Sequence, residues 1–262
     1  MGVVNVTPDS FSDGGLFLDP GAAIAHGLAL VEEGAEILDV GGESTRPGAQ
    51  PVAEAEELRR VGPVVEGLAG SGAQISIDTS KASVARAALE AGAALVNDVT
   101  ALRGDPEMAA VVAQSGAECC LMHMRGEPRT MQRGGGPQYE DVVAEVKAFL
   151  DERLAFAVGE GISEGLVLLD PGIGFGKTLE HNLQLLRRLD ELAALGRPLV
   201  VGTSRKSFLG RILPEATIAE RLPGTIATCV LAYERGASVL RVHDVAPVRA
   251  ALAVAAATLS AP

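Results

Sequence analysis

The stretch Leu166-Val-Leu-Leu-Asp170 is a run of apolar residues that ends in a carboxylate, and Pro171-Gly-Ile-Gly-Phe-Gly-Lys177 follows it. A short apolar run bounded by glycine and proline is typical of a buried strand. Apolar runs with polar residues at their ends recur along the chain. The expected strands are residues 2–5, 36–40, 74–78, 94–98, 118–123, 166–170, 199–202 and 238–242.

Longer amphipathic segments rich in Ala, Leu, Glu and Arg separate these strands, and repeated strand–helix units are the signature of α/β folds. The expected helices lie near residues 20–33, 52–69, 81–91, 106–115, 140–159, 179–194, 216–234 and 245–259. Pro20, Pro106 and the N-cap candidate Asp244 mark helix starts. This alternation suits an open doubly wound sheet as well as a closed barrel.

The positions of the polar residues distinguish these two folds. Each expected strand ends in Asn, Asp, His, Arg or a Gly-Thr-Ser turn, and barrel enzymes build their sites at the carboxyl ends of the strands. The length of 262 residues suits one barrel, and no linker or low-complexity tract divides the chain. We therefore predict a single (β/α)8 TIM barrel over residues 1–262, with the active site at the C-terminal face of the strands.

The composition excludes several classes of function. A net charge of −12 opposes non-specific binding to nucleic acid or anionic lipid. The apolar runs are too short to span a bilayer and no secretory pattern is present, so we expect a cytoplasmic protein without nucleic-acid or membrane partners. Cys119, Cys120 and Cys229 lack the spacing of a disulfide framework or a metal site, and we expect reduced core residues.

Two loops carry more polar groups than a turn between strand and helix requires. The first expected strand leads into Asn5-Val-Thr-Pro-Asp-Ser-Phe-Ser-Asp-Gly-Gly, and the second ends in Asp39-Val-Gly-Gly-Glu-Ser-Thr-Arg-Pro-Gly. Glycine lets a backbone approach a ligand closely, while Thr45 and Arg46 offer a hydroxyl and a planar cationic donor suited to phosphate. These loops predict the binding of a small anionic substrate.

Arg241 and His243 lie two residues apart in or just after the last expected strand, so we expect their side chains to share a face and to point into the barrel mouth. A lone His on a strand is more often structural, but the pair favours anion binding. The loop after Asp170 resembles a phosphate-binding loop, yet Pro171 occupies the position of its first glycine. We interpret it as a turn that positions Asp170 and Phe175.

These loops and several later motifs resemble the dihydropteroate synthase family over almost the whole chain. The later motifs are Ser76-Ile-Asp-Thr, Asn97-Asp, Met122-His-Met-Arg-Gly, Leu169-Asp-Pro-Gly-Ile-Gly-Phe-Gly-Lys, Gly202-Thr-Ser-Arg-Lys-Ser-Phe-Leu-Gly and Arg241-Val-His-Asp. The resemblance implies a transferase of folate biosynthesis that condenses 6-hydroxymethyl-7,8-dihydropterin diphosphate with p-aminobenzoate to 7,8-dihydropteroate and pyrophosphate. It also implies a homodimer and a target of sulfonamides.

The resemblance assigns recognition of the pterin to residues at the strand ends, because a carboxylate can accept two parallel hydrogen bonds from the ring edge. The residues expected to bind the pterin are Asp78, Asn97, Val99, Met122, Asp170, Phe175, Gly202 and Lys206. Asp170 is the first choice for the ring edge. The alternative for Asp78 and Asp170 is a helix cap at a strand–helix junction, and for Lys206 it is a solvated surface lysine.

The resemblance also assigns residues to the diphosphate, the metal and the second substrate. Thr45, Arg46, Arg241 and His243 are expected to bind the diphosphate. Mg²⁺ is expected to arrive with it and to contact Asn5. Phe11, Pro47, Phe175 and Ser207 are expected to bind p-aminobenzoate. The expected catalytic residues are Asp13, Thr45, Arg46 and Lys206, although Asp13 could simply form a turn before Gly14-Gly15.

Two other functions stay open at this point. A pterin-binding methyltransferase barrel resembles this family in the Asp and Asn residues that hold the ring, but Ser204-Arg-Lys-Ser207 and the first two loops favour the synthase. The second alternative is a paralogue that binds a pterin without turnover, and the chain has no lost motif to support it.

Overall fold

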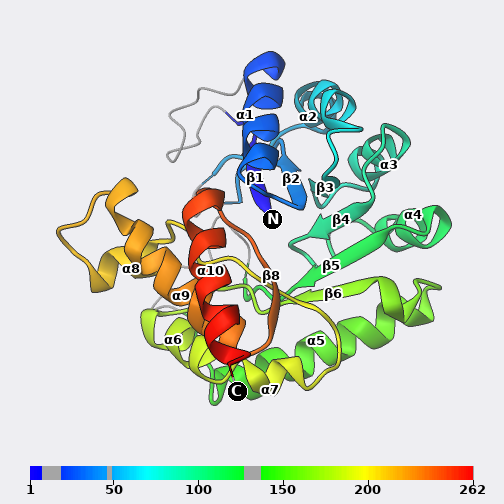
Figure 1. Ribbon diagram of the computed structural model, residues 1–262. Helices are drawn as coiled ribbons and strands as arrows, with labels where there is room; N and C mark the ends of the chain where they lie inside the picture. Colours follow the sequence, from blue (N-terminus) through cyan, green and yellow to red (C-terminus); the bar gives the residue numbers. More distant parts are fainter. Residues whose placement is uncertain (8–18, 46–48, 127–136, 262) are drawn as a thin grey trace.

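The eight strands of the computed structural model, which describes residues 1–7, 19–45, 49–126 and 137–261, form one parallel sheet. They are β1 (Gly2–Asn5), β2 (Ile37–Gly41), β3 (Gln74–Asp78), β4 (Leu95–Asp98), β5 (Glu118–Met122), β6 (Val167–Asp170), β7 (Leu199–Val201) and β8 (Ala237–Leu240). Each strand pairs with the next in chain order. The N–H of Val3 donates to the carbonyl of Val242 (3.0 Å), which joins the last segment to β1 and closes the predicted barrel (Figure 1).

Helices surround the ring of strands in Figure 1. They are α1 (Pro20–Glu32), α2 (Glu54–Leu68), α3 (Ala82–Glu90), α4 (Met108–Ser115), α5 (Val142–Gly159), α6 (Leu179–Arg187), α7 (Asp190–Ala193), α8 (Ser207–Ile212), α9 (Leu222–Glu234) and α10 (Val245–Leu259). Asp19 caps α1 by accepting from the N–H of Ala22 (2.9 Å), and Pro20 starts that helix as predicted. None of the helices in the described part of the chain is long and apolar enough to cross a bilayer.

Three expected element bounds are wrong. Residues 179–194 form two helices, α6 and α7, because the backbone leaves the helical conformation at Arg188. The short helix α8 was not expected, and α9 begins at Leu222, where Pro223 favours a helix start. Strand β8 ends at Leu240, since beyond it the pairing with β1 continues only as a bridge between Gly2 and Val242.

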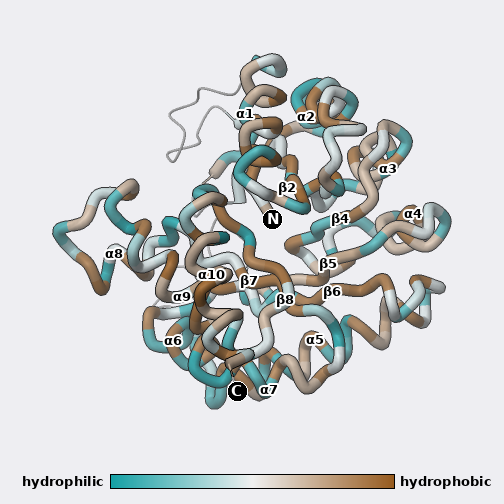
Figure 2. The backbone as a smooth tube through the Cα atoms, in the orientation of Figure 1, coloured by the Kyte–Doolittle hydropathy of each residue, from teal (hydrophilic) through white to brown (hydrophobic). Residues whose placement is uncertain are grey.

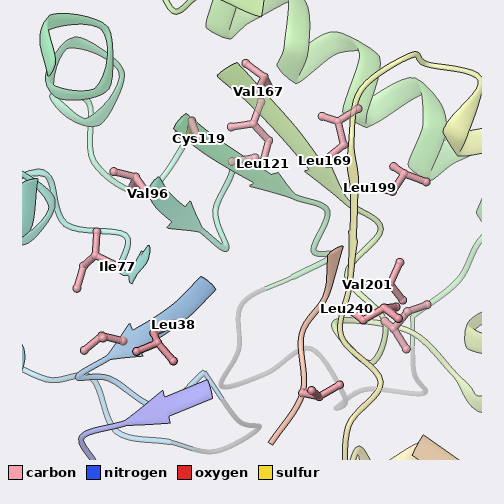
Figure 3. Close-up of a cluster of buried hydrophobic side chains, with 14 of the residues drawn as sticks. Leu38, Ile77, Val96, Cys119, Leu121, Val167, Leu169, Leu199, Val201 and Leu240 are labelled. Carbon is pink, nitrogen blue, oxygen red and sulfur yellow. The ribbon is translucent and has the colours of Figure 1, made fainter. Parts of the chain in front are cut away.

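The apolar core has two layers, because side chains alternate between the two faces of each strand. Residues such as Leu121 and Leu169 face outward and pack against the helices, and Figure 3 shows this outer layer. A separate buried cluster of Leu95, Cys120, Leu168 and Val200 fills the barrel interior. Figure 2 shows the hydrophobic colours along central strands such as β5 and β6. The three cysteines are buried free thiols, which agrees with the prediction.

Above this inner cluster the inward-facing positions become polar. The strand register places Asp39 beside Ser76 and Asp78 beside Asn97, and it places Met122 beside Asp170. The carboxyl ends of parallel strands lie on one face of a barrel, so these side chains gather on one surface. We call Asp39, Ser76, Asp78, Asn97 and Arg241 the polar floor.

Candidate active site

Asp39 is the centre of the polar floor, although no role was predicted for it. Its side chain is fully buried and accepts three hydrogen bonds, from Ser76 Oγ (2.6 Å), Asn97 Nδ2 (3.1 Å) and Arg241 Nε (2.5 Å). A buried carboxylate is stable only when it is paired and hydrogen-bonded in this way. The signal in the sequence is a charged residue in the middle of the apolar strand Ile37–Gly41.

The hydrogen bond to Asp39 orients the side-chain amide of Asn97. A carboxylate only accepts hydrogen bonds, so the group that faces Asp39 must be the NH2 of the amide. The carbonyl oxygen of Asn97 is therefore the atom left to accept from a ligand. This arrangement leaves Asn97 as a hydrogen-bond acceptor for an N–H group of a ligand.

Arg241 joins Asp39 to Asp78, because its Nη2 donates to Asp78 Oδ2 (2.9 Å). Burial and the negative charge of Asp39 raise the pKa of Asp78 to about 7, against the opposing effect of Arg241. Burial lowers the pKa of Arg241, but Asp39 and Asp78 outweigh it and the net change is upward. Arg241 therefore stays charged, while Asp78 titrates near neutral pH.

Asp170 and Lys206 form the opposite side of the site. Asp170 is buried and accepts from the N–H of Gly172 (2.6 Å); burial raises its pKa and Lys206 opposes the rise. The Lys206 ammonium donates to the carbonyl of Ile173 and lies 4.9 Å from the centre of the Phe175 ring. Burial lowers the pKa of Lys206 to about 8, partly offset by Asp170.

The alternative roles of these residues are wrong. Lys81 occupies the N-cap of α3 and Thr178 that of α6, so neither Asp78 nor Asp170 caps the helix that follows its strand. Lys206 is half-buried and directed toward Ile173 and Phe175, so it is not a solvated surface lysine.

Lys177 supports the glycine-rich loop that holds Phe175, and it too had no predicted role. It is fully buried, and its ammonium contacts the carbonyls of Gly172 (2.9 Å) and Phe175 (3.0 Å) and the Nδ1 of His123 (2.9 Å). Burial is the main cause that lowers the pKa of His123 to about 2, and Lys177 adds to it, although burial also lowers the pKa of Lys177 well below its ordinary value. The imidazole is therefore neutral and can accept. The side chain of Lys177 thus holds the backbone of this loop in place through hydrogen bonds to its carbonyls, as expected for a turn that positions Asp170 and Phe175.

An apolar wall lies beside these polar groups. Val99, Met122 and Met124 form a small buried cluster against which Phe175 packs. Val99, Met122 and Phe175 were expected here from the resemblance, whereas Met124 was not. Gly202 lies between the two cationic residues, because a Cβ built on it would be 3.6 Å from Lys206 Nζ and 3.7 Å from Arg241 Cβ.

A pocket of about 190 Å³ opens beside Asp78. Its lining residues are Glu43, Ser44, Thr45, Ala49, Pro51, Glu57, Asp78, Thr79, Ser80, Val99 and Thr100. Lys81 bridges Glu43 and the buried Glu57, which fixes the base of the loop that carries Thr45. A larger hollow of about 440 Å³ is lined by Ile212, Leu213, Pro214, Glu215, Ala216 and Glu220, and none of the predicted site residues lines it.

The remaining predicted residues are placed as follows. Asn5 is half-buried at the end of β1, and Ser207 is the exposed first residue of α8. Arg241 and His243 follow β8 and diverge, since Arg241 reaches β2 and β3 whereas the His243 ring lies 3.0 Å from Ser204 Oγ. The predictions for Phe11, Asp13, Arg46 and Pro47 lie outside the described residues.

The donor set limits the kind of metal that this site could take. Among the described residues there is no group of three or more His, Cys, Asp or Glu side chains that could hold a metal ion. Asn5 offers a single amide oxygen at the barrel mouth. That set fits an ion that keeps oxygen ligands from phosphate and water, as Mg²⁺ does.

Comparison with known proteins gives a consistent result. The family model described as "Pterin binding enzyme" matches residues 1–243. The chain is 50% identical to the dihydropteroate synthase of Mycobacterium leprae, covering 100% of this chain and 93% of the relative. It is 48% identical to the dihydropteroate synthase of Escherichia coli, covering 100% of this chain and 92% of that relative.

Solved structures agree. A Yersinia pestis dihydropteroate synthase in complex with a sulfonamide drug superposes with a TM-score of 0.96 at 45% identity, covering 100% of this chain and 94% of that one. The structure of Xanthomonas albilineans dihydropteroate synthase with 4-aminobenzoic acid has a TM-score of 0.92 at 49% sequence identity, covering 100% of this chain and 93% of that one. The structure of the same enzyme with 7,8-dihydropteroate has a TM-score of 0.88 at 46% sequence identity, covering 100% of this chain and 94% of that one.

Proposed function

The chain belongs to the pterin-binding enzyme family, and we propose that it condenses 6-hydroxymethyl-7,8-dihydropterin diphosphate with p-aminobenzoate, as a dihydropteroate synthase of folate biosynthesis. The observation that carries this proposal is the combination of the polar floor with Asp170, Lys206 and the apolar wall at one end of the barrel. This combination offers acceptors and a cation to the edge of a flat heterocycle. A purely anion-binding site would need neither the buried carboxylates nor the wall.

Pterin recognition would use groups that the fold already orients. Asp170 would accept from the ring's amino and amide N–H groups, and the carbonyl oxygen of Asn97 would accept from a further N–H. Asp78 lies beside Asn97 in the register and would complete this edge. Lys206 would donate to the acceptor side of the ring. Val99 and Met122 would contact its face.

The diphosphate would be bound by Arg241 and His243, with Thr45 and Arg46 from the second loop. Because Arg241 is held by two carboxylates, it is preorganised to stabilise the charge that builds up as pyrophosphate leaves. Asn5 would contact a Mg²⁺ ion that arrives with the diphosphate. When bound, the ion supplies further neutralisation of the leaving group.

The reaction needs no nucleophile from the protein. The C–O bond of the pterin methylene breaks, and pyrophosphate leaves with the electron pair. The amine of p-aminobenzoate then forms the C–N bond and loses a proton. Phe175 and Ser207 would contact this second substrate, together with Phe11 and Pro47, and Asp13 would support the first loop near the reacting groups. Holding both substrates in one geometry is the main source of rate in such a two-substrate reaction.

We also propose a homodimer in the cytosol, with small molecules as its only other partners. The exposed apolar residues Leu231 on α9 and Val254 and Leu259 on α10 support a protein partner at this face, and a second copy of the chain fits such a surface. The buried free thiols suit a reducing compartment.

The assay of this proposal is pyrophosphate release by the purified protein. We expect release only when pterin diphosphate, p-aminobenzoate and Mg²⁺ are all present, and we expect a sulfonamide to compete with p-aminobenzoate. Asp170→Ala should abolish pterin binding in calorimetry, because the ring loses its buried acceptor. Arg197→Ala, which alters a pair with Glu164 before β7, serves as the control and should behave like the wild type.

The same experiment separates the two alternatives. A pterin-binding paralogue without turnover would bind the pterin diphosphate but release no pyrophosphate. A methyltransferase barrel would bind a methylated folate and ignore p-aminobenzoate. The relatives and structures named above are dihydropteroate synthases, which gives neither alternative a supporting observation.

A further inference from the structure

Two segments that carry substrate-binding groups are fastened together at the barrel mouth. The segment after β7 contains Lys206 and Ser207, and the segment after β8 contains Arg241 and His243. Ser204 Oγ accepts from the backbone N–H of His243 (3.2 Å). The next residue in each segment forms an ion pair, in which Arg205 Nε and Nη2 donate to Asp244 Oδ2 (3.0 Å) and Oδ1 (2.6 Å).

Asp244 makes this ion pair instead of the hydrogen bond that would cap the following helix. It occupies the N-cap of α10, where an Asp side chain normally accepts from a free N–H of the first turn. Among the described contacts Asp244 makes no such capping hydrogen bond, and both of its oxygens lie on Arg205. The prediction that Asp244 marks the start of this helix is therefore confirmed, because Asp244 occupies the N-cap position, but its side chain does not make the capping hydrogen bond.

The backbone of Arg205 adds a second observation. Its φ of 58° lies in the left-handed region, which is unfavourable for a residue with a Cβ. The surrounding structure holds it there, because its N–H donates to Thr225 Oγ1 (3.2 Å) and its carbonyl accepts from Arg221 (3.3 Å). Such strain persists only where several contacts determine it, and Lys206 is the next residue along the chain.

We propose that the Arg205–Asp244 ion pair is a positioning clamp, which sets the spacing between the Lys206 and Ser207 side of the site and the Arg241 and His243 side. The inference rests on the proposed function. Arg205 and Asp244 are positioning residues, because each acts through its neighbours. The pterin diphosphate is one covalent molecule that must reach both sides at once. A spacing error of about 1 Å can cost roughly a hundredfold in such a reaction.

The clamp is tested by comparing a linked ligand with its separate halves. In Arg205→Ala and Asp244→Ala, we expect the Kd of 6-hydroxymethylpterin and that of pyrophosphate to stay within about threefold of the wild-type values. The Kd of the intact pterin diphosphate should rise about thirtyfold, because only the linked ligand depends on the spacing between the halves. Equal losses for the halves and the linked ligand, or no loss for any, would overturn the proposal.

A double-mutant cycle gives the second readout. The variant with both substitutions should be no worse than either single variant in kcat/KM, because each removes the same contact; multiplied losses would contradict a clamp. Arg205→Lys keeps the charge but not the two-pronged contact, so it should be intermediate. Asp244→Asn keeps the side-chain shape and replaces Asp244→Ala if that variant fails to fold.

The control is Arg197→Ala at the other end of β7. Its side chain is 24% exposed against 19% for Arg205, and it also pairs with an acidic residue, Glu164. It should keep wild-type ligand affinities. Wild-type turnover is measured in parallel: without it the proposed function fails, whereas the comparison of linked and separate ligands still decides the clamp.

Discussion

Asp78 and Asp39 share the single guanidinium of Arg241, so that one cation serves two carboxylates of the polar floor. Asp39 has Ser76 and Asn97 as further donors, whereas within the described part of the chain the side chain of Asp78 accepts from Arg241 alone. Burial, together with the negative charge of Asp39, raises the pKa of Asp78 to about 7 from an ordinary value of 3.8. Asp78 is thus held in an environment that lowers the stability of the folded chain at neutral pH.

This cost leads to a prediction about pH. Between about pH 4 and pH 7 the folded chain retains a proton on Asp78 that the unfolded chain has released, so the unfolding free energy falls as pH rises through that window. Asp78→Asn removes this loss. We expect the variant to be more stable than the wild type near pH 8, by on the order of 2 kcal/mol, and to lose turnover.

Thermal unfolding at a series of pH values checks this prediction. The stability gain of Asp78→Asn should vanish below about pH 3, where Asp78 is protonated in both the folded and the unfolded wild type. Asp39→Asn is the matched control and should be destabilised, because an amide cannot accept all the hydrogen bonds from Ser76, Asn97 and Arg241. A destabilised Asp78→Asn at neutral pH would contradict the account.

Among the elements, the loop between β6 and α6 is the one whose backbone the site depends on most. Gly172 and Gly176 have φ angles of 67° and 61°, and a Cβ on either would collide with a backbone carbonyl, that of His123 or Arg125. The loop therefore packs directly on the segment after β5. Its glycines allow a close approach between two backbones, which explains their place in the motif.

Gly172→Ala should consequently displace Asp170 and Phe175 together. We expect kcat/KM to fall by roughly a hundredfold, with weaker binding of both substrates, because a shift of about 1 Å suffices for such a loss. Gly165→Ala is the control before the same strand, where a Cβ meets open space. Steady-state kinetics with each substrate varied in turn would measure the effect, and near wild-type kinetics for Gly172→Ala would rule out the proposed close approach.

At the scale of the whole molecule, the face formed by α9 and α10 is the strongest candidate for contact with a second copy. Val254 is 68% exposed and Leu259 57%, and much of α10 is alanine. The two helices lie side by side (Figure 1). Exposed apolar side chains that gather in one patch mark protein contacts, whereas singly scattered ones do not, and two packed helices can bring such side chains together.

We therefore predict that the protein sediments as a dimer and that Val254→Glu, combined with Leu231→Glu, yields a monomer, since charges would be buried without partners at the interface. Analytical ultracentrifugation at several concentrations would measure this. Leu28→Glu is the control, because Leu28 is exposed to a similar extent as Leu231 but lies on α1. A wild-type monomer, or a dimer that survives both substitutions, would exclude this interface.

The order of the strands and the face that bears the site could be predicted from the sequence. Apolar runs, their polar ends and the spacing between them are local features, and a parallel barrel converts strand ends into one surface. Asp78 and Asp170 end their strands and Asn97 lies one residue before the end of its strand, so their place on this face could be predicted, whereas the binding roles of Asp78 and Asn97 came from the family resemblance. The split of α6 from α7 and the extra helix α8 depend on local turns with weaker signals.

The partners of the buried charged groups were decided by the tertiary structure alone. Asp39 meets Arg241 across 202 positions of sequence, and Lys177 meets His123 across 54. Closure of the barrel brings β8 beside β1 and so Arg241 toward Asp39, whereas the pairing of β5 with β6 brings Lys177 to His123. A buried charge therefore takes the donor or acceptor that the ring places opposite it. Local patterns therefore predict where the polar ends gather, but only the closed ring determines which of them pair.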